Sequence, residues 1–176
     1  MKISSYKITT MGLLMALSII LTRIASLRIA IGGVEGVRIG IGKLPVILGG
    51  IIFGPLSGGL IGALSDIIGY FINPIGAYMP HFTLTSALTG VIPAMVLRIL
   101  QREYEPKVLE LGIAVSSGHV IISLIMIPYF LNSLFEIPWT ILMSARIIAA
   151  PINILIYVYM IRMMLKRNLF NPALVK

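Results

Sequence analysis

The sequence contains no cysteine, and this absence excludes disulfides, thiol catalysis and cysteine-ligated zinc or iron–sulfur sites. Charged residues are also scarce. They make up 11% of the 176 residues, whereas a typical soluble domain carries about 25%. So few charges cannot cover a surface that faces water. Because 58% of the residues are hydrophobic, we predict an integral membrane protein.

Acidic residues are the rarest charged group, with six Asp and Glu against fourteen Lys and Arg, a net charge of +8. In a soluble protein this balance would indicate a nucleic-acid partner. In a membrane protein it is better explained by cytoplasmic anchoring under the positive-inside rule. The sequence shows no paired carboxylates, no Ser-His-Asp set and no metal-ligand spacing. We therefore expect no enzyme activity, no metal, no cofactor and no nucleic-acid partner.

Long apolar runs fill most of the chain. A membrane-spanning helix needs about 20 apolar residues, so the length suits one all-α domain, a bundle of six transmembrane helices. The predicted spans are residues 8–27, 44–54, 56–72, 82–100, 108–130 and 139–165. The first run resembles a signal peptide, but residues 22–25 make a poor cleavage site. The second is short for a full crossing.

The segment 27–44 changes period, because apolar residues alternate with small or charged ones on both sides of the Gly-rich link 32–36. This alternation predicts a hairpin, which forms a structured first outer loop. The same segment contains a false phosphate loop. Five residues separate Gly36 from Gly42 instead of four, and Leu44 replaces the required Ser or Thr. We therefore do not expect the chain itself to bind ATP.

Glycines recur every four residues at Gly50, Gly54, Gly58 and Gly62. A row of residues without side chains lets helices approach closely. We predict that the second and third spans pack tightly on each other or on a partner.

The orientation of the bundle follows from Lys and Arg, which gather on cytoplasmic loops. With six spans both termini lie on one side. The basic residues of that side are Lys2, Lys7, Arg98, Arg102, Lys107, Arg162, Lys166, Arg167 and Lys176. The other side has only Arg28, Arg38 and Lys43. We therefore expect cytoplasmic termini and outward-facing loops at 27–44, 73–82 and 131–138.

Three charges fall at one depth inside the spans: Arg23, Asp66 and Arg146. At 1.5 Å per residue they lie roughly 6–10 Å below the outer surface. Each costs on the order of 2.5–3.5 kcal/mol to insert, so such residues normally face a cavity and pair. One interpretation is an internal salt bridge between Asp66 and one arginine. The other is that the surplus arginine, with Arg38 above it, binds an anion such as a carboxylate.

Two other groups of residues have alternative interpretations. Aromatic residues gather at the outer ends of the spans, where an interfacial belt is expected; for Tyr78 and Phe82 the alternative is stacking on a flat ligand. The aromatic residues are Tyr70, Phe71, Tyr78, Phe82, Tyr129, Phe130, Phe135 and Trp139. His119 and Asn153 lie near mid-membrane. We interpret His119 as a hydrogen-bonded core residue, with a proton relay as the alternative.

Four motifs carry a resemblance to a known family. They are Arg38-x-Gly40-x-Gly42-x-x-Pro45, Phe53-Gly54-Pro55-x-x-Gly58, Asp66-x-x-Gly69, and the run Gly76-Ala77-Tyr78-Met79-Pro80-His81-Phe82-Thr83-Leu84. Together they resemble the substrate-binding S components of energy-coupling-factor (ECF) vitamin transporters. The last motif, with Ala87-Leu88-Thr89-Gly90-x-x-Pro93, is most similar to the folate members.

The resemblance implies a mechanism and partners. An S component captures a vitamin from outside the cell membrane of a prokaryote. It associates with a transmembrane coupling subunit and two ATPases, and it reorients to release the vitamin inside. Small residues on the first helix form the docking surface of this family, a role that Gly12 and Ala16 fit.

Folate suits the charges of the predicted site. Its flat pterin donates N–H groups that Asp66 can accept, and its glutamate tail is a dianion. The expected substrate-binding residues are Arg23, Arg38, Asp66, Tyr70, Tyr78, His81, Phe82, Thr85, Trp139 and Arg146. The alternatives are another ligand of the same transporter class, such as riboflavin, or a small channel or integral membrane enzyme.

Overall fold

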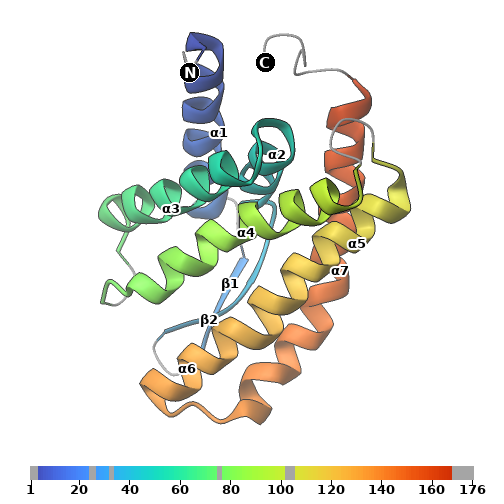
Figure 1. The fold of residues 1–176 in the computed structure, drawn as a ribbon. Coiled ribbons are helices and arrows are strands. Elements are labelled where there is room, and N and C mark those ends of the chain that lie inside the picture. Colours follow the sequence, from blue (N-terminus) through green and yellow to red (C-terminus); the bar gives the residue numbers. More distant parts are fainter. Residues whose placement is uncertain (1–3, 24–26, 32–33, 75–76, 102–105, 168–176) are drawn as a thin grey trace.

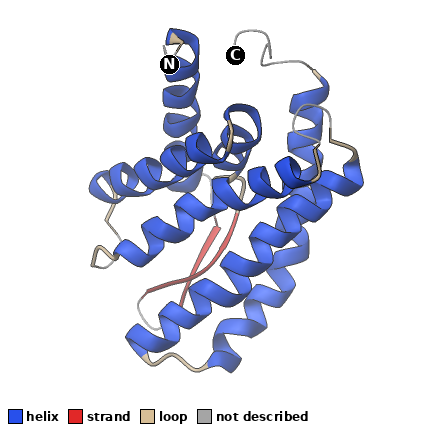
Figure 2. Cartoon of the chain, viewed as in Figure 1, coloured by secondary structure: helices blue, strands red, loops and turns tan. Residues whose placement is uncertain are grey.

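The computed structural model describes residues 4–23, 27–31, 34–74, 77–101 and 106–167. The structure consists of helices and one short antiparallel hairpin (Figures 1 and 2). The helices are α1 (Ser5–Arg23), α2 (Leu44–Phe53), α3 (Pro55–Ile72), α4 (Pro80–Ile99), α5 (Val108–His119), the π-helix η1 (Val120–Met126), α6 (Ile127–Phe135) and α7 (Trp139–Lys166). The start of α1 and the end of α7 lie at the same end of the molecule in Figure 1.

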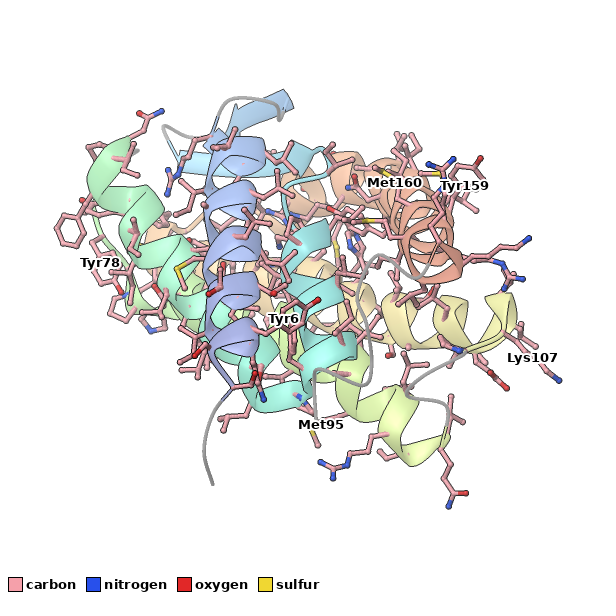
Figure 3. The ribbon with its side chains drawn as sticks, turned by 90° about the horizontal axis from the view of Figure 1, so that it is seen from above. Tyr6, Tyr78, Met95, Lys107, Tyr159 and Met160 are labelled. Atoms are coloured by element: carbon pink, nitrogen blue, oxygen red, sulfur yellow. The ribbon has the colours of Figure 1, made fainter. Side chains whose placement is uncertain are left out.

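Five helices in the described residues are long and apolar enough to cross a membrane. They are α1, α3, α4, α7 and the continuous helix Val108–Phe135, and the short α2 is the sixth helix of the bundle. Large apolar side chains project outward from them, such as Leu13, Leu56 and Leu155, each at least 67% exposed. Figure 3 shows side chains projecting all around the bundle. The predicted fold class, a six-helix membrane bundle, is confirmed.

The predicted hairpin is also present. Strand β1 (Leu27–Ile31) pairs antiparallel with β2 (Val34–Ile39), with Leu27 opposite Ile39. The register shifts between Ile29 and Ala30. Seen from above in Figure 3, the hairpin (light blue) lies along one edge of the helical bundle.

Helix α2 is the centre of the apolar core. Its ten residues extend about 15 Å, which is half of a hydrocarbon core of about 30 Å. Every residue of α2 except Ile52 is buried. The helix ends at Gly54, whose φ of +93° is a conformation that favours glycine. Lys7 then donates a hydrogen bond from Nζ to the carbonyl of Phe53 at 3.4 Å, where the helix dipole favours a cation.

The glycine ridge brings three helices together. A Cβ on Gly58 of α3 would lie 2.5 Å from Cα of Gly50 in α2 and 2.8 Å from the carbonyl oxygen of Gly90 in α4. The predicted close packing of the second and third spans is confirmed. The part played by Gly90 was not predicted.

The fifth span is longer than its prediction of 108–130. The helix runs without a break to Phe135, through Pro128 and a π-helical segment. Within that segment the N–H of Ile127 donates to the carbonyl of Ile122, five residues earlier. A proline has no N–H, and its ring clashes with the preceding α-helical turn. The wider π turn gives Pro128 this room, so the helix continues.

Candidate functional site

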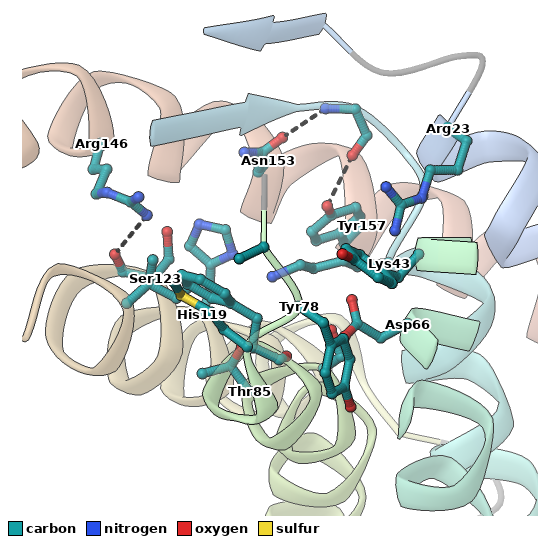
Figure 4. Close-up of a pocket in the computed structure, with 18 residues that line it drawn as sticks. Arg23, Lys43, Asp66, Tyr78, Thr85, His119, Ser123, Arg146, Asn153 and Tyr157 are labelled. Carbon is teal, nitrogen blue, oxygen red and sulfur yellow. Dashed lines mark hydrogen bonds between the residues drawn. The ribbon is translucent and has the colours of Figure 1, made fainter. Parts of the chain in front are cut away.

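A cavity of about 160 Å³ lies between the hairpin and the surrounding helices (Figure 4). Four charged side chains line it: Arg23 of α1, Lys43 just before α2, Asp66 of α3 and Arg146 of α7. Positive charges therefore outnumber negative ones three to one. Such a lining suits a ligand with at least one carboxylate, because arginine binds this group with two parallel hydrogen bonds.

The structure brings together most of the residues that the sequence suggested. The predicted residues that line the cavity are Arg23, Asp66, Tyr70, Tyr78, Phe82, Thr85 and Arg146. Arg23, Asp66 and Arg146 were expected at one depth because the rise per residue of a helix is constant, and all three line this cavity. Their contact with a ligand stays a prediction.

Two predicted residues lie outside the lining of the cavity. The ring of His81 packs against Phe130 with ring centroids 4.9 Å apart, and Trp139 is 41% exposed at the start of α7. His81 precedes Phe82 in α4, and neighbouring residues point about 100° apart around a helix of 3.6 residues per turn. Only one of the two faces the cavity. Arg38 lies in β2, and its side chain is outside the described residues.

The arginines bond to backbone carbonyls, whereas the hydrogen-bond partner of Asp66 is a hydroxyl. Nη1 of Arg23 donates to the carbonyl of Asn73 at 2.8 Å, at the end of α3, where a cation is favoured. The Arg23 guanidinium also lies over Gly69, because a Cβ there would be 3.1 Å from its Nε. Oγ1 of Thr83 donates to Oδ2 of Asp66 at 2.7 Å.

The π-helix explains how Arg146 is held. This side chain is 4% exposed, and its Nη1 donates to the carbonyl of Ser123 at 3.3 Å. In an α-helix that carbonyl would accept from the N–H of Ile127, which here donates to Ile122 instead. The donor five residues on would be Pro128, which has no N–H. The carbonyl of Ser123 is thus available to Arg146.

Helices α7 and α1 fix the base of the hairpin beside the cavity. The hydroxyl of Tyr157 donates to the carbonyl of Gly40 at 2.8 Å, and the N–H of Gly40 donates to Oδ1 of Asn153 at 3.4 Å. Ser18 donates to the carbonyl of Gly42 at 2.9 Å. Figure 4 shows the two bonds to Gly40 at the upper edge of the cavity.

Sequence reasoning missed several lining residues. Lys43 was interpreted as an outer-loop charge, and His119 as a core residue, yet both line the cavity with Ser123 and Tyr157. A usable signal was present, because His119, Ser123 and Ile127 recur every four residues and all three line the cavity. Among the described residues, no group of three or more His, Asp or Glu side chains is placed to bind a metal ion.

Comparisons with known proteins give three findings. The family model "ECF-type riboflavin transporter, S component" matches residues 2–168. The folate transporter FolT of Clostridium novyi (strain NT) is 43% identical over 82 residues, which are 47% of this chain and 45% of that relative. The alignment therefore spans less than half of the relative.

The third finding is a solved structure of FolT bound with folic acid. It matches with a TM-score of 0.74 and 24% identity, over 90% of this chain and 95% of that one. At this identity the likeness establishes the fold.

Proposed function

Because the chain belongs to the family of ECF-type riboflavin transporter S components, we propose that it is the vitamin-binding subunit of an uptake transporter and that its ligand is folate or a folate derivative. Family membership confirms the resemblance drawn from the motifs, and the chain is a multi-pass membrane component of a transporter. The observation that carries the ligand proposal is the cavity lined by three cationic side chains and one carboxylate. The partial match to a folate transporter supports it.

The cavity offers a place for each part of folate. Asp66 accepts N–H groups of the pterin, and Tyr70, Tyr78 and Phe82 flank its ring. Arg146 lies across the cavity from Asp66 in Figure 4. We assign Arg146 to the glutamate tail, so the ligand lies along the line between these two residues.

Further residues complete the proposed site. Lys43 and Arg23 add positive charge around the ligand, and Arg38 of β2 remains a predicted ligand-binding residue. Thr85 lines the cavity, and its hydroxyl already donates to the carbonyl of Phe82 at 2.8 Å. Thr85 therefore offers the ligand an acceptor.

Riboflavin is the second candidate, because the matching family model carries its name. Riboflavin is flat and carries no carboxylate. It can stack on the same aromatic residues, but it offers no anionic group to the net positive lining of the cavity. The charge of the lining is therefore our reason to place folate first.

The energy for transport comes from partners in this proposal, a transmembrane coupling subunit and two ATPases. Gly12 and Ala16 lie one turn apart on an exposed face of α1, and a Cβ on Gly12 would meet nothing within 4 Å. We assign this face to the coupling subunit. The termini are cytoplasmic in this proposal, in the cell membrane of a prokaryote, and the cavity opens outward.

Ligand binding to the detergent-solubilised protein tests the proposal. Folic acid and 5-formyl-folate should raise the melting temperature, riboflavin should not, and mass spectrometry should identify a folate that co-purifies with the protein. Stabilisation by riboflavin alone would transfer the function to the second candidate. Stabilisation by none of the three would refute vitamin binding of either kind.

The position of the tail has its own test. A hydrogen bond to a charged group is worth about 1.5–3 kcal/mol, so Arg146→Ala should weaken folic acid roughly tenfold to hundredfold. The binding of pterin alone should hardly change. Arg162→Ala, an exposed arginine at the far end of α7, is the matched control. Equal losses for folic acid and pterin would show that Arg146 does not hold the tail.

A further inference from the structure

The hydroxyl of Thr83 links two residues that line the cavity. Its Oγ1 lies 2.7 Å from Oδ2 of Asp66 and 2.9 Å from the hydroxyl oxygen of Tyr78. Thr83 itself is one turn into α4 and is not part of the lining. The three side chains come from α3, from α4 and from the segment that precedes α4.

The direction of both hydrogen bonds follows from counting protons. A threonine hydroxyl has one hydrogen, and an ionised carboxylate can only accept. Thr83 therefore gives its hydrogen to Asp66, and Tyr78 must donate to Thr83. The result is a directed relay, from Tyr78 through Thr83 to Asp66.

The relay determines what the cavity presents to a ligand. Oδ2 of Asp66 is held by Thr83, which fixes the plane of the carboxylate and leaves Oδ1 to accept other donors. The hydroxyl hydrogen of Tyr78 is used by Thr83, so this residue offers the ligand its ring and not a donor. That ring also packs against Tyr70, with centroids 5.2 Å apart.

We propose that Thr83 is a positioning residue, which orients Asp66 to accept N–H donors from a flat heterocycle and holds Tyr78 beside the same acceptor. Tyr78 is 41% exposed, so it forms part of the rim of the cavity. Binding at Asp66 and retention by the rim thus depend on one hydroxyl group. The assignment of the heterocycle to a pterin rests on the proposed function.

Two substitutions of Thr83 test the proposal by titration calorimetry and stopped-flow dissociation of folic acid. Thr83→Val keeps the shape of the side chain and removes the hydroxyl, whereas Thr83→Ser keeps the hydroxyl. We expect Thr83→Val to weaken folic acid about tenfold, mainly through faster dissociation. Thr83→Ser should stay within about twofold of the wild type, because the bond to the carboxylate is retained.

Tyr78→Phe completes a double-mutant cycle. Alone it should cost about threefold in affinity, as expected for loss of a neutral hydrogen bond. In the Thr83→Val background it should cost nothing further, because the relay is already broken. Tyr129→Phe, an exposed tyrosine of α6 outside the lining, controls for loss of a hydroxyl. Additive effects of the two substitutions, or a Thr83→Ser protein as weak as Thr83→Val, would overturn the proposal.

A fragment of the ligand separates positioning from a general structural effect. The compound p-aminobenzoylglutamate carries the tail of folate without the pterin. Thr83→Val should leave its affinity unchanged in a competition assay. An equal loss for this fragment and for folic acid would mean that Thr83 only supports the fold.

The inference and the proposed function fail in different ways. If the wild type does not bind folic acid, the ligand assignment fails, and the relay is judged from melting temperatures of the ligand-free variants. Coupled losses for Tyr78→Phe and Thr83→Val then support the relay, and additive losses refute it. If the wild type binds folic acid and the affinity cycle is additive, only the inference about Thr83 fails.

Discussion

Replacing Gly58 by alanine should disrupt the contact between three helices. The new methyl group would lie 2.5 Å from Cα of Gly50 and 2.8 Å from the carbonyl oxygen of Gly90. Carbon atoms in contact are about 3.5–4.0 Å apart, so α2 and α3 must separate by about 1 Å. Both neighbours are backbone atoms and cannot move aside as the end of a side chain can.

The size of the effect is set by two opposing contributions. Overpacking a tight contact costs about 1–3 kcal/mol, and rigid backbone neighbours place this site at the upper end. Alanine stabilises a helix by about 1 kcal/mol relative to glycine. The net loss is about 2 kcal/mol, which corresponds to a melting temperature roughly 4–8 °C lower for a chain of this size.

Thermal unfolding in detergent, with Gly12→Ala as the matched control, measures this loss. Gly12 lies in α1, and a Cβ there meets no atom within 4 Å. The control gains the same helix propensity of alanine without a steric clash, so its melting temperature should equal or exceed that of the wild type. A Gly58→Ala protein that melts as high as the control would refute the inference that this contact needs glycine.

Three further predictions concern the site and its partners. Gly69→Ala places a methyl group 3.1 Å from Nε of Arg23. It should weaken the binding of folic acid several-fold in calorimetry and leave the melting temperature nearly unchanged. An unchanged affinity would contradict this prediction. Tyr157→Phe removes the bond to the hairpin, worth about 1 kcal/mol, and should lower the melting temperature by roughly 2–4 °C. The control is Tyr159→Phe, at a tyrosine that is 73% exposed, and it should leave the melting temperature unchanged. Ala16→Trp should abolish vitamin uptake in proteoliposomes with the partner subunits and preserve binding in detergent; loss of both would make this face of α1 structural.

The elements of the fold were predictable because each has a local signal. Long apolar runs gave the helices, alternation around glycines gave the hairpin, and the four-residue glycine spacing gave the contact of α2 with α3. The contribution of α4 to that contact had no such signal. Gly90 stands outside the glycine series, and its place opposite Gly58 depends on how α4 packs across α3.

The sequence predicted the depth of the site residues in the membrane better than it predicted the directions in which their side chains point. The rise of a helix is constant, so Arg23, Asp66 and Arg146 were expected at one level, and they line one cavity. The direction of a side chain depends on the rotation of each helix about its axis. This rotation separates Phe82, which lines the cavity, from His81, which packs on Phe130.

Because of the π-helical segment, the number of residues between α5 and α6 matters for the site, and not only their apolar character. Removing one residue from 120–122 should convert the π turn into a regular α-helical turn, in which the N–H of Ile127 donates to the carbonyl of Ser123. The carbonyl that Arg146 uses would then be occupied by a backbone donor, although the segment would stay as apolar as before. Single-residue deletions here should therefore be far more harmful than substitutions between apolar residues. In an alignment of relatives, a one-residue gap at this place should coincide with the absence of a proline at 128.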